Sequence, residues 1–334
     1  MANKLTIKDI AKLAGVSKAS VSRVLNGYQH VRPELRARVQ KVIDETGYER
    51  NTVARLLATD RSNVIGLLIP SGATAIFSDP YFARLIEGIS RAANQYHLTL
   101  ALFIFYSQEE GIESLQNIIS DGFLDGLILS SDYKDDALFN RLADSQMRFV
   151  MIGRPPNNEH ISFSDVDNFN GGKIAAEHLI QQGYQRIGII TANHNLAAED
   201  RYWGYRRALD SHSIPFDENL CAAGDFSQQS GAIAMAQLLP YRPDAVFVTS
   251  DMMASGALQT LKQHDVRVPD DVALMGFDDL PPALQTDPLL TTIHQPIDES
   301  GSRAVKALKQ LIDNPQQEPI QTILPTRLIV RESA

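Results

Sequence analysis

From Val64 onward, short runs of apolar residues alternate with amphipathic stretches that have helical spacing. This alternation constrains the fold more than any other feature, because it is typical of parallel strands joined by crossover helices. It predicts strands at 64–69, 98–104, 126–129 and 149–152. Helices are expected near 82–96, 111–121 and 136–145. These segments predict one α/β lobe.

The alternation is repeated farther along the chain, with strands expected at 164–167, 186–191, 245–249 and 272–277. Helices are expected at 171–182, 200–211, 229–239 and 253–264. The repetition predicts a second, similar lobe with its own parallel sheet. A chain of 334 residues is long enough for these lobes and a further small module.

The first residues have a different pattern, which predicts three short helices. Thr6 is a capping hydroxyl ahead of a helix that ends near Leu13, and Gly15 breaks it. Ser17 caps the next helix, whose apolar positions share one face. Pro33 begins a third helix that stops at Gly47. Two helices joined by such a turn predict an all-α helix-turn-helix domain.

The charge of the chain is distributed unevenly. The whole sequence has a net charge of -9, but residues 1–60 contain 11 Lys+Arg and 6 Asp+Glu, which leaves +5 there and -14 in the remainder. A basic N-terminal segment is the expected electrostatic footprint of a phosphate-binding surface. The charge therefore favours a nucleic-acid partner for this segment alone.

The second helix of this head has the side chains that reading a major groove requires. Its early positions are small or flexible, and a basic residue follows one turn later: Lys18, Ala19 and Arg23. A purely structural three-helix bundle with a solvated polar face is the alternative. The charge asymmetry argues against that alternative.

A longer stretch of the head resembles a known family. The residues Thr6-Ile7-Lys8-Asp9-Ile10-Ala11-Lys12-Leu13-Ala14-Gly15-Val16-Ser17, continuing as Ser20-Val21-Ser22-Arg23-Val24-Leu25-Asn26-Gly27, closely resemble the DNA-binding head of the lactose-repressor (LacI/GalR) family. The resemblance implies a transcriptional regulator that binds a pseudo-palindromic operator as a homodimer. It implies DNA contacts from Thr6, Ser17, Lys18, Ala19, Ser22, Arg23 and Asn26.

The resemblance continues through Asn51-Thr52-Val53-Ala54-Arg55-Leu56-Leu57, which is similar to the hinge helix of that family. So short a helix is unstable alone in water and is expected to order only against a partner. The resemblance implies that Leu57 wedges into the minor groove, that Asn51 caps the helix and that Arg55 contacts the DNA backbone. An ordinary buried leucine is the alternative for Leu57.

Matching segments across the rest of the chain imply a sensor similar to periplasmic sugar-binding proteins, with crossovers near residue 163, near residue 292 and near the C-terminus. The expected domains are a head at 1–49, a hinge at 50–60 and a sensor at 61–334. Within the sensor, the expected N-lobe is 61–163 plus 293–323, and the expected C-lobe is 164–292 plus 324–334.

Ligands of two-lobed parallel sheets bind at the carboxyl ends of the strands. Asp167, Asp251 and Asp278 follow or end predicted strands, where a carboxylate can accept hydrogen bonds from sugar hydroxyls, and Arg201 offers a fork of donors. The family's ligand positions fall on Tyr81, Phe82, Asp167, Arg201, Phe226, Ser250 and Asp278. The alternatives are a core role for Phe82, a helix cap for Asp251 and a turn for Asp278.

Other classes of function find little support in the sequence. It has no Gly-x-Ser-x-Gly elbow, no P-loop, no Gly-x-Gly-x-x-Gly opening a helix and no His/Cys cluster with metal-ligand spacing. No enzyme activity, cofactor or metal is therefore expected. Asn195-Leu196-Ala197-Ala198 lacks the polar readers of a nucleobase-binding member, which favours a sugar effector without naming it. A sugar-binding transport component remains the alternative for the sensor half.

The remaining signals concern location and assembly. A single cysteine, Cys221, fits a reducing compartment, and the sequence shows neither a signal peptide nor an apolar run that would span a membrane. We therefore expect a cytoplasmic protein without a membrane partner. A homodimer is expected because the chain ends soon after its last predicted strand, without the leucine-rich tail of tetrameric family members.

Overall fold

The computed structural model describes residues 5–25, 28, 30–48, 61–70, 76–105, 108–120, 122–130, 137–155 and 160–334. The chain divides into two units, Met1–Ser62 and Asn63–Ala334. Asn26, Asn51, Arg55 and Leu57, for which the sequence predicts DNA contacts, lie outside the described residues.

The first unit contains the helices that the sequence predicts, α1 (Ile7–Leu13), α2 (Lys18–Leu25) and α3 (Pro33–Thr46). The turn between α1 and α2 contains Gly15, whose φ of +64° is a backbone conformation that suits glycine. Gly47 ends α3 with a φ of +61°. Apolar side chains of α1, α2 and α3 form the core of the unit: Ile10, Ala11, Ala14, Val21, Val24 and Val39.

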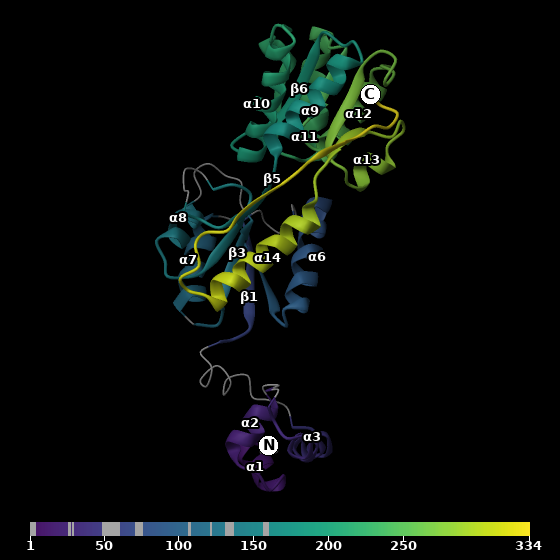
Figure 1. Ribbon diagram of the computed structural model, residues 1–334. Coiled ribbons are helices and arrows are strands. Elements are labelled where there is room, and N and C mark those ends of the chain that lie inside the picture. Colours follow the sequence, from purple (N-terminus) through teal and green to yellow (C-terminus); the bar gives the residue numbers. More distant parts are fainter. Residues whose placement is uncertain are drawn as a thin grey trace. The chain divides into compact units, whose positions relative to one another are not determined.

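The first lobe of the second unit is built on a parallel sheet. Its strand order is β11-β5-β4-β3-β1-β2. The strands are β1 (Val64–Ile69), β2 (Thr99–Ile104), β3 (Gly126–Ser130), β4 (Phe149–Ile152), β5 (Phe163–Val166) and β11 (Gln321–Leu324). The lobe also contains α6 (Pro80–Gln95), α7 (Gln108–Ser120), α8 (Ala137–Ala143) and α14 (Ile297–Asp313), and α14 lies beside α6 in Figure 1.

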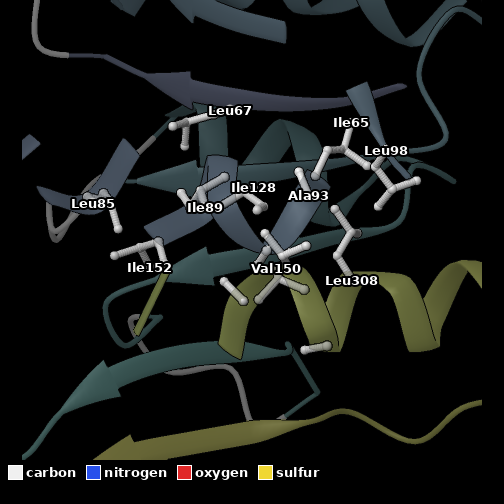
Figure 2. Close-up of a cluster of buried hydrophobic side chains, with 14 of the residues drawn as sticks. Ile65, Leu67, Leu85, Ile89, Ala93, Leu98, Ile128, Val150, Ile152 and Leu308 are labelled. Atoms are coloured by element: carbon white, nitrogen blue, oxygen red, sulfur yellow. The ribbon is translucent and has the colours of Figure 1, made fainter. Parts of the chain in front are cut away.

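Every residue of β1 is buried, which explains why this strand is an uninterrupted apolar run in the sequence. Its residues Ile65 and Leu67 pack with Ile89 of α6, Val150 of β4 and Leu308 of α14. Figure 2 shows Leu308 directed at this cluster from α14. Each such side chain contributes roughly 1.5–3 kcal/mol when fully buried. On the other face of β1, Leu68 packs with Leu115 of α7 and Phe139 of α8, so the strand lies between two layers of helices.

The second lobe repeats the arrangement with the strand order β12-β10-β9-β8-β6-β7. The strands are β6 (Ile187–Ala192), β7 (Cys221–Gly224), β8 (Ala245–Val248), β9 (Ala273–Asp278), β10 (Thr291–His294) and β12 (Arg327–Ile329), of which β12 is antiparallel to β10. The helices are α9 (Asn168–Gln181), α10 (Leu196–Ser211), α11 (Gln228–Leu238), α12 (Asp251–Gln263) and α13 (Pro281–Gln285). Short 3-10 turns at Glu218–Leu220 and Leu239–Tyr241 complete the lobe.

The prediction that the strand at 164–167 belongs to the second lobe was wrong. This strand, β5, pairs with β4 and β11 in the first sheet. The chain leaves the first lobe only after β5, on its way into α9, so the sequence neighbour of the strand is a helix of the other lobe. It passes between the lobes again after β10 and after β11, and Figure 1 shows the C-terminal segment running back to the second lobe.

Among the residues that the structure describes, no helix is both long enough and apolar enough to cross a membrane.

Candidate functional site

A cavity of about 560 Å³ opens at the carboxyl ends of the strands, between the lobes of the second unit. The first lobe contributes residues at the ends of β3, β4 and β5, and the second lobe contributes residues that follow β8 and end β9. This is where two-lobed parallel sheets bind small ligands, and the volume lies in the usual range for such sites. Six of the predicted ligand residues line it: Tyr81, Phe82, Arg201, Phe226, Ser250 and Asp278.

Arg201 projects from α10 and is only 5% exposed. Its Nε donates to Oδ1 of Asn168 at 2.9 Å, and its Nη1 donates to the carbonyl oxygen of Thr249 at 2.6 Å. The guanidinium also lies over the ring of Phe277, with Cζ 3.7 Å from the ring centroid. These contacts fix the orientation of a buried cation at the floor of the cavity.

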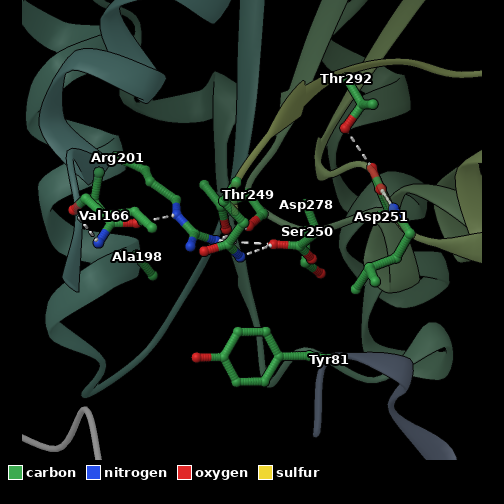
Figure 3. A network of polar contacts seen from close by, with 12 residues as sticks. Tyr81, Val166, Ala198, Arg201, Thr249, Ser250, Asp251, Asp278 and Thr292 are labelled. Carbon is green, nitrogen blue, oxygen red and sulfur yellow. Dashed lines mark hydrogen bonds and ion pairs between the residues drawn. The ribbon is translucent and has the colours of Figure 1, made fainter. Parts of the chain in front are cut away.

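Asp278 ends β9 beside this cation, with its Oδ1 atom 3.8 Å from Nη1 of Arg201. The same oxygen accepts a hydrogen bond from Nε2 of Gln295 at 2.5 Å. Burial raises the pKa of Asp278 to about 7, although Arg201 acts to lower it. Figure 3 shows this polar network facing the ring of Tyr81. Near neutral pH the carboxyl can therefore accept or donate a hydrogen bond.

The raised pKa of Asp278 predicts a pH-dependent stability. Because an unfolded aspartate ionises near 3.8 and Asp278 near 7, the unfolded chain binds fewer protons between these values, and stability falls as pH rises. The pKa of Asp251 is raised as well, by its own burial and by Asp278, and adds to the same trend. Urea unfolding from about pH 4 to about pH 8 should show a smaller decline for Asp278→Asn than for the parent.

The control for this measurement is Asp210→Asn, at an exposed position of α10. Its slope should equal that of the parent. An identical slope for Asp278→Asn and the parent would contradict the raised pKa of Asp278.

Aromatic side chains form the apolar part of the cavity wall. Tyr81 and Phe82 lie in the first turn of α6, with ring centroids 5.4 Å apart and planes at 85°. Phe226 follows β7 on the opposite lobe and adopts a φ of +68°. Rings from both lobes thus border the space into which polar groups project, as a ligand with apolar faces and polar edges requires.

Ser250 and the two remaining predicted residues have defined local roles. Ser250 caps α12 by accepting from the backbone N–H of Met253 at 3.2 Å, and it also lines the cavity. Asp251 and Asp167 do not line the cavity, contrary to expectation. Asp251 is fully buried and accepts from the Leu280 backbone N–H and the Thr292 hydroxyl, and Asp167 caps α9 through Asn170.

Sequence reasoning missed several residues that line the cavity, including Asp79, Asp165, Asn168, Asn195 and Gln295. Asp79 precedes Pro80 and accepts from the Tyr81 N–H at 2.9 Å, so the Asp-Pro pair at a helix start was an available signal. Asn195 likewise caps α10 by accepting from Ala198. Asp165 and Asn168 lie close to Asp167 in the sequence. The sequence does not show at which residue β5 ends, so it could not tell which of these side chains reaches the cavity.

An ion pair links the lobes beside the cavity. Arg154 follows β4 in the first lobe, and its Nη2 atom lies 2.7 Å from both carboxylate oxygens of Asp200 on α10. The Arg154 side chain is half exposed, and that of Asp200 is about one quarter exposed. The neighbours of this pair, Gly153 and Arg201, line the cavity. The pair therefore joins the lobes where both approach a bound ligand.

The head presents a polar helix surface of its own. Thr6 caps α1, and the Asp9 carboxylate accepts from its backbone N–H and its hydroxyl at 2.8 and 2.7 Å. Ser17 caps α2 by accepting from the Ser20 N–H at 3.1 Å. On α2, Lys18, Ala19 and Arg23 are exposed and Ser22 is partly buried. Small and basic side chains are thus available along one face of this helix.

Comparison with known proteins bears on both units. Residues 6–51 match the bacterial regulatory proteins of the lacI family, and residues 176–334 match the periplasmic binding protein-like domain. The chain is 36% identical over 335 residues to the HTH-type transcriptional regulator CelR of Thermobifida fusca, with 98% of each chain covered. It is 35% identical over 336 residues to the HTH-type transcriptional repressor PurR of Escherichia coli O139:H28, covering 98% of this chain and 96% of PurR.

Solved structures of full-length regulators have the same architecture. A CelR–cellobiose complex has a TM-score of 0.79 and 34% identity, covering 99% of this chain and 100% of that one. A lac repressor dimer bound to operator and the anti-inducer ONPF has a TM-score of 0.85 and 26% identity, covering 99% of each chain.

A helix-turn-helix head followed by two parallel-sheet α/β lobes defines a transcriptional regulator with a periplasmic-binding-protein-like effector domain. Identity above one third over nearly the whole of both chains establishes the family. The chain belongs to the lacI family of bacterial regulators. It is therefore a DNA-binding transcriptional regulator and not an enzyme.

Proposed function

We propose that this regulator represses carbohydrate-use genes as a cytoplasmic homodimer on a pseudo-palindromic operator, and that a sugar or sugar derivative in the cavity releases it. The observation that carries the effector class is the combination of aromatic rings with the Arg201–Asp278 pair and the Ser250 hydroxyl around one cavity. Apolar ring faces and hydroxyl edges are the two surfaces that a sugar presents to such a wall.

The relatives support this effector class. One similar solved structure is a complex of CelR with cellobiose, and 34% of its residues are identical to this chain. In this chain the cavity has aromatic side chains on both lobes, so a sugar bound between them would contact both. A ligand that contacts both lobes can favour one arrangement of the lobes over another, which is the requirement for coupling to DNA binding.

On the DNA side, we propose that α2 enters the major groove, where Lys18, Ala19, Ser22 and Arg23 face the bases. Thr6 and Ser17 would contact the DNA backbone and so position the helix. The exposure of Lys18, Ala19 and Arg23 supports this role. Two heads related by two-fold symmetry would recognise a palindrome. For the hinge at 50–60 we propose the roles that the family resemblance implies: Asn51 caps its helix, Arg55 contacts the DNA backbone and Leu57 wedges into the minor groove. Asn26 is a further proposed DNA contact.

The experiment is a gel-shift titration with a selected palindromic operator and the full chain, followed by addition of mono- and disaccharides that include cellobiose. Operator binding lost on deletion of residues 1–60, and release by a saccharide, are the expected results. If no saccharide alters operator binding, the proposal of a sugar effector is rejected. If the protein binds no DNA sequence selectively, the proposal of a palindromic operator is rejected.

Arg23→Ala is expected to weaken operator binding by about 1–3 kcal/mol and to relax base preference at one position of each half-site, because a bidentate contact to a base edge is lost. Arg38→Ala, an exposed basic residue of α3, is the control for loss of charge in the same head. Selection of binding sites by both variants distinguishes the two effects. The same consensus from Arg23→Ala as from the parent would exclude Arg23 from base reading.

A further inference from the structure

The charged side chains around the cavity are mostly acidic. Among the described residues that line it, the carboxylates are Asp79, Asp165, Asp225 and Asp278, and the basic side chain is Arg201. A cavity bordered by one sign of charge concentrates its field on the space inside it. A ligand that enters therefore meets a predominantly negative environment.

Arg201 offsets this negative balance only in part. Its guanidinium already contacts Asp278, Asn168 and the Thr249 carbonyl oxygen, and it is stacked on a ring. An anion at this position would have to compete with Asp278 for the same cation. Its Nε and Nη1 atoms are thus engaged by the protein, and its one positive charge stands against four carboxyl groups around the cavity.

Helix N-termini are the other groups that bind anions, because their free N–H groups and dipoles favour negative charge. At this end of the sheets they are capped by the chain's own side chains. Asp79 caps α6, Asp167 caps α9, Asn195 caps α10, Ser227 caps α11 and Ser250 caps α12. Side-chain oxygens therefore occupy positions that a phosphate or carboxylate would take.

We infer that the cavity accepts an uncharged, hydroxyl-rich saccharide and rejects sugar phosphates and sugar acids. This inference rests on the proposed sugar effector and narrows its chemical class. Asp278, whose pKa is about 7, can accept or donate a hydrogen bond. An ionised carboxylate at the other three positions only accepts hydrogen bonds, so a bound ligand must supply donors there. A neutral sugar supplies them from every hydroxyl, whereas an added phosphate or carboxylate brings acceptors and negative charge to an acidic wall.

The test compares matched pairs of ligands on the full chain. The pairs are cellobiose with cellobiose 6′-phosphate, glucose with glucose 6-phosphate, and glucose with glucuronate, so that every charged member keeps its pyranose rings. Binding is followed by the fluorescence of Trp203, the single tryptophan, which lies on α10 close to Arg201 in sequence, and by release of labelled operator. The neutral member of an active pair is expected to bind at least about tenfold more tightly than its charged partner, which corresponds to about 1.4 kcal/mol.

Variants then identify the source of the discrimination. Asp79→Asn and Asp225→Asn remove charge but keep the shape and an oxygen acceptor. Asp79 accepts from the Tyr81 N–H as the cap of α6, where asparagine serves about as well as aspartate, and Asp225 accepts from the Ser227 N–H in the turn before α11. Each should raise the ratio of charged to neutral affinity several-fold. Asp210→Asn, on an exposed part of α10, is the control and should leave this ratio unchanged.

The outcomes separate this inference from the proposed function. If a phosphate or carboxylate member binds as tightly as its neutral partner and releases operator, the inference fails and the sugar effector stands. The inference also fails, and the sugar effector again stands, if neither cavity variant changes the ratio. If neither neutral nor charged saccharides release operator, the proposed effector fails and the inference fails with it.

Discussion

Arg201→Ala is expected to abolish effector-driven release of operator and to lower the free energy of unfolding by about 3–5 kcal/mol, because it breaks a buried ion pair. The loss has two sources in the structure. The carboxyl of Asp278 is left without its cation, and Asn168 and the Thr249 carbonyl lose the donors that satisfy them. The destabilisation should shrink below about pH 7, where Asp278 becomes protonated.

A double variant separates the structural role from the ligand role. Arg201→Met with Asp278→Asn replaces the buried pair by neutral side chains of similar size, which is often neutral for stability. It should recover the part of the unfolding free energy that the unpaired Asp278 carboxyl costs, although Asn168 and the Thr249 carbonyl oxygen still lack their donors. It should bind operator, yet fail to release it with the saccharide that acts on the parent. Release of the double variant at the parental concentration would exclude both residues from the effector site.

Gly204→Ala is expected to destabilise the protein by about 3 kcal/mol, at the upper end for overpacking of a well-packed site. A Cβ atom on Gly204 of α10 would lie 1.9 Å from the carbonyl oxygen of Phe169 on α9. The matching position on α9, Gly172, would place a Cβ 2.0 Å from the carbonyl oxygen of Arg201. Backbone atoms cannot rotate away as side chains do, so α9 and α10 must separate.

The expected loss of stability is opposite in sign to the usual effect of this substitution. Glycine to alanine inside a helix normally stabilises it by about 1 kcal/mol, so destabilisation can come only from the contact between the helices. Urea unfolding is the measurement, with Arg207→Ala at an exposed position of the same helix as control. Because Arg201 lies one turn away on α10, Gly204→Ala should also weaken effector binding. Equal or greater stability would contradict the close packing of α9 against α10.

Much of the fold was predictable because the central strands of both sheets are buried on both faces. Runs such as Val64–Ile69 and Ala245–Val248 are apolar throughout and stand out in the sequence. The strands that were missed lie toward sheet edges and are short or partly exposed, as Cys221–Gly224 and Gln321–Leu324 show. The lobe of β5 was predicted wrongly although β5 pairs with β4, the strand before it in the sequence, because the chain crosses to the other lobe only after β5 and no local pattern marks this crossing.

The candidate site was predictable in part for a related reason. A polar residue just after a strand is well placed both to reach a ligand and to cap the next helix. Ser250 lines the cavity and also caps α12, whereas the side chain of Asp251, one residue later, is directed into the core toward Thr292. At the end of β5, Asp165 lines the cavity, whereas Asp167 caps α9. Sequence position alone does not reveal which way such a side chain turns.

The Arg154–Asp200 pair has a consequence for how such a regulator must be assayed. Both side chains are partly exposed, so dissolved ions weaken their attraction as they weaken contacts between the head and phosphates. Raising the salt concentration would thus act on DNA affinity and on the attraction between the lobes at once. The effector concentration needed for release therefore depends on the ionic strength of the buffer. Titrating Arg154→Ala beside the parent at each ionic strength separates the effect of salt on DNA affinity from its effect on the attraction between the lobes.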